Sequence, residues 1–127
     1  MDIILDTHTL IWFFEDDQRL SKLAIDTIYN IENIIYVSLA SVWEVAIKLS
    51  IGKLTFNGGI EKFIEAIYEN EFKLLDISPR HAKAVAKLPF IHRDPFDRML
   101  IAQAITEDMT VLTLDENIVK YEVNYMW

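Results

Sequence analysis

The feature that most constrains the fold of this 127-residue chain is an alternation of short apolar runs with longer segments of helical period. The runs are brief, rich in Ile, Val and Leu, and apolar at consecutive positions, which is typical of parallel strands buried on both faces. They are IILD (3–6), NIIYVS (33–38), FKLLDI (72–77) and TVLTLD (110–115). This alternation predicts an α/β fold of three layers, with a central parallel sheet of about four to five short strands flanked by helices.

Helical signals fill the segments between these runs. Apolar residues recur three and four apart in 21–31 and 60–69, and a third helical segment, 41–51, stops at a glycine. Ser78-Pro79 opens a helix that runs to about Lys87, and Pro95 opens another that runs to about Thr106. Because there is no repeat and no linker, we expect one domain that covers residues 1–127.

The charge balance limits the classes of function. Twelve basic and 20 acidic residues give a net charge of −8, which argues against a protein that coats a phosphate backbone by bulk electrostatics. Five of the basic residues lie between positions 80 and 98, and this cluster is either a local anion site or a solvated helix face. The chain has no cysteine, no basic leader and no apolar stretch long enough for a bilayer, so we expect a cytoplasmic protein without membrane contact.

Four acidic residues fall at special places in this pattern. Asp6 and Asp115 end two predicted strands, whereas Glu44 and Asp97 lie in the first turns of predicted helices. Strand ends and the starts of following helices share one edge of a parallel α/β sheet, where ligands bind. Four carboxylates there would repel one another, and a hard cation such as Mg²⁺ or Mn²⁺ relieves the repulsion.

Each of these acids also has a structural interpretation. Asp6 and Asp115 suit helix caps, and Ser41 with Glu44 matches a capping box. In the stretch 94–97, Asp94 is a sufficient cap for the helix that Pro95 opens, which leaves Asp97 for chemistry. The convergence of all four acids on one edge favours the metal site.

The ordered motifs LDTHTLIW, SVWEVAIK, HRDPFDRMLIAQA and VLTLDENI resemble those of the PIN-domain ribonucleases. The resemblance is strongest to the VapC-type toxins of toxin–antitoxin pairs and their relatives that begin with Asp-Thr-His. It implies a PIN-like fold and metal-dependent endonucleolytic cleavage of RNA that leaves a 5′-phosphate and a 3′-hydroxyl. It also implies one or two Mg²⁺ or Mn²⁺ ions at the cluster of Asp6, Glu44, Asp97 and Asp115, a small antitoxin partner, and a homodimer.

Four further residues are candidates for supporting roles. Thr113 matches a hydroxyl position of the family. Arg98 and Lys48 are candidates for steering phosphate, with a surface charge or an i,i+4 pair with Glu44 as the alternative. His8 is a candidate for contacting substrate or orienting the first acid, or else for a hydrogen bond at a helix start.

The other histidines and the tryptophans are interpreted as less informative. His81 and His92 lack a spaced partner and are not predicted as metal ligands. The three tryptophans, Trp12, Trp43 and Trp127, fit core or interface positions better than base-stacking positions.

Two other function classes remain open from the sequence. One is a non-catalytic PIN-scaffold module that only binds a partner. The other is a Mg²⁺-binding receiver-type phosphoacceptor, which is less favoured because it should carry a lysine at a late strand end before proline. Here the nearest such spacing, KLP (87–89), follows a helix.

Overall fold

The computed structural model describes residues 1–127 and contains one parallel sheet of five strands in the order β3-β2-β1-β4-β5. Strand β1 lies at the centre, and Leu5 at its end is paired with Val37 on one side and Leu112 on the other. The carboxyl ends of three strands therefore lie side by side. The strands are β1 (Asp2–Leu5), β2 (Ile34–Ser38), β3 (Lys73–Leu75), β4 (Thr110–Leu112) and β5 (Tyr125–Met126).

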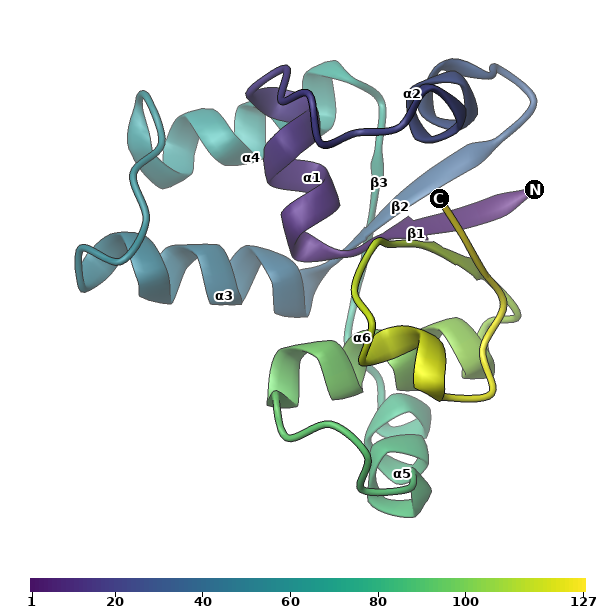
Figure 1. Ribbon diagram of the computed structural model, residues 1–127. Coiled ribbons are helices and arrows are strands. Elements are labelled where there is room, and N and C mark those ends of the chain that lie inside the picture. Colours follow the sequence, from purple (N-terminus) through teal and green to yellow (C-terminus); the bar gives the residue numbers. More distant parts are fainter.

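Six α-helices flank this sheet and confirm the predicted three-layer α/β fold. Figure 1 shows α1, α2 and α4 on one face and α5 and α6 on the other, with α3 running away from the end of β2. The helices are α1 (Thr7–Phe14), α2 (Lys22–Tyr29), α3 (Leu39–Ser50), α4 (Gly59–Glu69), α5 (Pro79–Lys87) and α6 (Pro95–Thr106). None of them combines the length and the apolar character that a membrane span needs.

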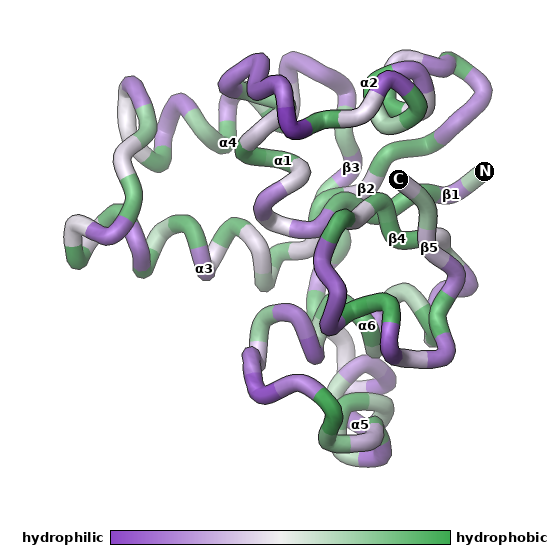
Figure 2. The backbone as a smooth tube through the Cα atoms, in the orientation of Figure 1, coloured by the Kyte–Doolittle hydropathy of each residue, from purple (hydrophilic) through white to green (hydrophobic).

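The buried core is divided by the sheet. Side chains of a strand alternate between its two faces, so Ile3 and Leu5 join one apolar cluster while Ile4 joins the other. All three are completely buried, which explains the unbroken apolar run of β1. In Figure 2 the hydrophobic colour gathers in the middle of the fold, and hydrophilic stretches lie in the outer loops.

The helix starts show where the sequence interpretation was right and where it was wrong. Ser78 caps α5 and Asp94 caps α6, each followed by proline, as predicted. Helix α3 begins at Leu39, earlier than predicted, because the Ser38 side chain accepts from the amide of Ala40 and serves as the cap. Ser41 is not a cap; its hydroxyl accepts a hydrogen bond of 2.9 Å from the Thr7 hydroxyl.

Candidate active site at the acidic edge of the sheet

Asp6 is the first residue after the central strand. Its side chain is almost fully buried, and Oδ1 accepts a 2.7 Å hydrogen bond from the amide of Thr9, so Asp6 caps α1. Its other oxygen, Oδ2, accepts a hydrogen bond from the hydroxyl of Thr113, which follows β4. Burial raises the pKa of Asp6 above its usual range, although these hydrogen bonds act in the opposite direction. Thr113 thus contacts the first of the four acids.

Glu44 lies on the second turn of α3 and has only 4% of its side chain exposed. The Lys48 ammonium pairs with Oε2 at 2.7 Å, which is the i,i+4 pair considered from the sequence. The other oxygen, Oε1, is buried without any hydrogen-bond partner. Because Ser38 caps this helix, the capping-box interpretation of Glu44 is wrong. A buried carboxylate oxygen without a partner is costly, and a cation is a suitable partner for it.

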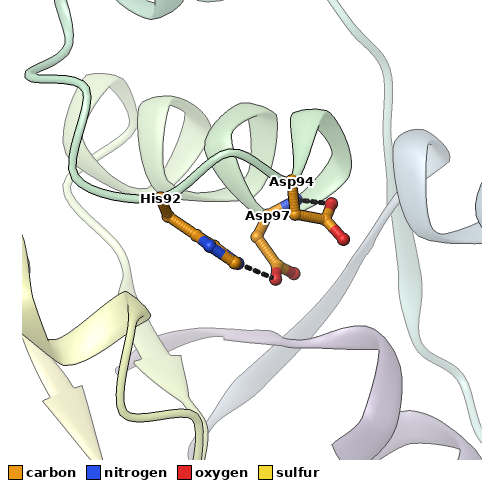
Figure 3. Close-up of side chains that lie close together, drawn as sticks. All are labelled: His92, Asp94 and Asp97. Carbon is orange, nitrogen blue, oxygen red and sulfur yellow. Dashed lines mark hydrogen bonds and ion pairs between the residues drawn. The ribbon is translucent and has the colours of Figure 1, made fainter.

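Asp97 lies in the first turn of α6 but does not cap this helix. Asp94 performs that role, since its Oδ1 accepts from the amides of Phe96 and Asp97 at 2.9 and 3.1 Å. The imidazole Nε2 of His92 lies 2.8 Å from Asp97 Oδ2, as Figure 3 shows. The pKa of Asp97 is raised from 3.8 to about 6, chiefly by burial and also by the charges of Asp94, Asp115 and Glu44, although the His92 bond acts in the opposite direction.

Asp115 lies three residues beyond the end of β4 rather than at its last position. Its Oδ1 accepts from the amides of Asn117 and Ile118 at 2.7 and 3.3 Å, so it orders the turn before a short 3₁₀ helix, Ile118–Lys120. Its own amide donates to the hydroxyl of Thr113 at 2.9 Å. Thr113 therefore connects Asp115 to Asp6.

The structure brings the four acids to the same edge in two groups. Asp6 and Asp115 line one cavity of about 260 Å³ together with His8. Glu44 and Asp97 lie on α3 and α6, which pack against each other, and the charges of Glu44 and Asp115 both act on Asp97. The four carboxylates do not form one tight ligand set. The three residues whose ligand atoms all lie within 4.8 Å of one another are His92, Asp94 and Asp97.

For Arg98, both interpretations from the sequence, phosphate steering and a surface charge, are wrong. It is neither a surface charge nor free to steer phosphate, because only 8% of the residue is exposed. Its guanidinium donates to the carbonyls of Pro89, Val85 and Leu88 and to the hydroxyl of Tyr121, at 2.9 to 3.3 Å. These bonds tie the end of α5 and the segment after it to α6.

His92 and Tyr121 are the site residues that the sequence did not reveal. The Tyr121 hydroxyl accepts from the amides of Ile91 and His92 at 3.1 and 2.8 Å, and this contact holds His92 beside Asp97. The only signal in the sequence was the spacing of His92 to Asp97, five residues across a helix start. Tyr121 gave none, since its partners lie about 30 positions away in the chain.

A comparison with models of protein families assigns almost the whole chain to one family. A family model described as PIN domain matches residues 3–124. The chain therefore belongs to the PIN-domain family, whose members are generally nucleases. A comparison with curated proteins gives no match.

Solved structures share the fold at low sequence identity. VapBC2 from Rickettsia felis, bound to a DNA fragment from its promoter, is 14% identical with a TM-score of 0.76, covering 99% of this chain and 98% of that one. FitAcB from Neisseria gonorrhoeae is 19% identical with a TM-score of 0.69, covering 98% and 96%. The PIN domain endonuclease Utp24 is 17% identical with a TM-score of 0.53, covering 94% and 74%. The chain is thus similar in fold to proteins of the VapBC and FitAB type.

Proposed function

We propose that this protein is a metal-dependent endoribonuclease and the toxin of a toxin–antitoxin pair, acting in the cytoplasm. The observation that carries the proposal is the buried, unpartnered Oε1 of Glu44, close enough to Asp97 to affect its pKa. Glu44 does not cap α3, and its pairing with Lys48 leaves Oε1 without a partner. Charges gathered at such a cost are typical of a functional site.

The donor set fits a hard divalent cation. Asp6, Glu44, Asp97 and Asp115 offer carboxylate oxygens without sulfur, which suits Mg²⁺ or Mn²⁺, either as one ion or as two. The chemistry that such an ion supplies is polarisation of a phosphate oxygen and activation of water near neutral pH. We propose that all four acids hold it, with hydrolysis giving a 5′-phosphate and a 3′-hydroxyl.

The chain's own residues keep the acids in place for this chemistry. Thr113 fixes Asp6 and, through the next turn, Asp115, so one hydroxyl orients two of the proposed ligands. Lys48 neutralises Glu44, and His92 holds one oxygen of Asp97. His8 is exposed at the mouth of the cavity shared by Asp6 and Asp115, where it is placed to meet substrate.

Partner proteins follow from the same proposal. The similar structures include VapBC and FitAB bound to DNA, so a small DNA-binding antitoxin is the partner we propose for this chain. We also propose a homodimer. Exposed apolar side chains near the acidic edge, such as Leu39 and Trp43 on α3, are free for protein contacts.

The test is cleavage of RNA by the purified protein. We expect cleavage with Mg²⁺ or Mn²⁺, none with EDTA, and loss of at least about 100-fold in Asp97→Asn, because one ligand charge is removed. The matched control is Asp94→Asn, which keeps activity because asparagine caps a helix as well as aspartate does. A protein that binds RNA or an antitoxin but never cleaves, with or without metal, would instead be a non-catalytic module on the PIN scaffold.

A further inference from the structure

Three side chains, Arg19, Trp12 and Trp127, are in contact beside the acidic edge. The Arg19 guanidinium lies over the indole of Trp12, with its central carbon 4.6 Å from the ring centroid. Trp12 packs against the apolar core on that side of the sheet, and the indole of Trp127 meets it edge-on at 5.9 Å. Trp12 and Trp127 are both partly buried against this core, whereas Arg19 is exposed.

The guanidinium is fixed in its plane by a second contact. Arg19 donates to both oxygens of Asp17, from Nε at 3.1 Å and from Nη2 at 2.7 Å. A long flexible side chain normally loses rotamer entropy when it orders, but here that cost is met before any ligand arrives. The Arg19 side chain is still 62% exposed, so the face opposite Trp12 is open.

The stack faces the cavity that contains two of the proposed metal ligands. Arg19 and Trp12 line the space of about 260 Å³ that Asp6 and Asp115 also line. A second cavity of similar size shares Arg19, Trp12 and His8 and continues toward Lys48 and Lys53. The two cavities therefore share Arg19 and Trp12, with two acids lining the first and two lysines and Glu15 lining the second.

We propose that Arg19, held flat by Asp17 and backed by Trp12, is a stacking platform for a base of the substrate RNA next to the cleaved phosphate. This inference rests on the proposed function, since it names the part of the substrate that binds beside the acids. Single-stranded RNA is commonly recognised by bases stacked on aromatic rings or arginine planes. The face of a nucleobase matches the exposed guanidinium plane, and the adjoining lysines match the phosphates that follow in the strand.

A simpler role for Arg19 is that of a point charge for phosphate, and the substitution Arg19→Lys separates the two roles. Lysine keeps the charge and the pairing with Asp17 but has no plane to stack. The probes are adenosine 5′-monophosphate and ribose 5-phosphate, which differ only in the base, in the presence of Mn²⁺. For the parent protein we expect the nucleotide to bind about tenfold more tightly than the sugar phosphate.

The platform predicts that Arg19→Lys brings this ratio close to one while ribose 5-phosphate binds as before. Asp17→Asn, which loosens the plane without touching Arg19 or Trp12, should lower the ratio in part. Arg80→Lys is the matched control and leaves the ratio unchanged, because Arg80 is an exposed arginine on α5. A ratio near one in the parent, or a full ratio in Arg19→Lys, would overturn the proposal.

A second measurement is independent of metal and of cleavage. Adenosine has no phosphate, so it reports the base site alone, and we expect it to shift the indole N–H resonance of Trp12 in the full-length protein. Ribose should leave that resonance in place, and an unshifted Trp12 with saturating adenosine counts against the platform. If the base ratio holds but no RNA is cleaved, the nuclease proposal fails and the platform stands. If RNA is cleaved but the ratio is near one, the platform fails and the nuclease proposal stands.

Discussion

Replacing Asp97 with asparagine should make the metal-free protein more stable above pH 6. In the folded protein the pKa of Asp97 is raised from the ordinary value of 3.8 to about 6, chiefly by burial. A difference of about 2 pKa units corresponds to about 3 kcal/mol of unfolding free energy. Only 18% of the Asp97 side chain is exposed, so solvent screening reduces this figure little. Asparagine keeps an acceptor for His92 and removes the charge.

The direction with pH follows from proton linkage. The folded state holds the Asp97 proton more tightly than the unfolded state does. Below about pH 3.8 the carboxyl is protonated in both states, so Asp97 does not lower the unfolding free energy there. The penalty grows as pH rises through 6 and is complete above that value. In EDTA at pH 8, we expect Asp97→Asn to melt about 10 °C higher than the parent. At pH 4 the two melting temperatures should nearly coincide.

Thermal melts followed by circular dichroism from pH 4 to pH 8 measure this gap. Asp108→Asn is the control for removing one negative charge, because Asp108 is exposed and its φ of 54° is one that asparagine tolerates. It should track the parent at every pH. A constant gap across the range, or an Asp97 variant that melts lower at pH 8, would refute the account of a desolvated carboxylate crowded by like charges.

Three further predictions concern the metal, the buried arginine and the exposed lysines. Asp6→Asn should melt higher than the parent without metal, gain much less than the parent from Mn²⁺ in the same melts, and lack nuclease activity. In urea titrations, Arg98→Met should lower the unfolding free energy by about 3 kcal/mol, because buried carbonyls lose their donor, and Tyr121→Phe should lower it by about 1 kcal/mol, because two amides lose their acceptor. Equal, small effects of the two substitutions would contradict a stabilising role for the hydrogen bonds of Arg98 and Tyr121. Replacing Lys83 and Lys87 together with glutamate should weaken RNA binding and flatten its salt dependence if α5 guides RNA, while Mn²⁺ affinity, measured by calorimetry, stays the same. An unaltered salt slope would assign both lysines to a solvated face.

The strands and most helix starts were predictable because local chemistry determines them. Ile3, Ile4 and Leu5 of β1 are buried on both faces of the sheet and are therefore all apolar, and proline suits the first turn of a helix, where Pro79 and Pro95 lie. β5 was not predicted because it has two residues, Tyr125 and Met126, which join the sheet through their neighbour β4 and not through any pattern of their own.

The placement of the four acids at one edge of the sheet was predictable, whereas the contacts around them were less so. Position at a strand end selected Asp6, and the sufficiency of Asp94 as a helix cap left Asp97 as a candidate, but the sequence does not show whether a charged side chain on a helix points inward. Arg98 therefore looked like a surface cation, although it is buried among backbone carbonyls. Glu44 matched a capping box by spacing, and only the earlier start of α3 at Leu39 shows that it does no capping. The Arg98 difference comes from contacts with residues distant in the sequence, and the Glu44 difference comes from a second serine, Ser38, that caps the helix.

The Asp6–Thr113 contact has a consequence for the synthesis of this protein. The two residues are 107 positions apart, so the segment that orients the first acid is synthesised long after that acid. Until β4 docks beside β1, Asp6 lacks its hydroxyl partner and Asp115 is not in place. A partly made chain on the ribosome, surrounded by RNA, thus has no assembled acidic edge. The acidic edge therefore depends on a contact between distant parts of the chain, and helix α1 with its cap Asp6 is not enough to form it.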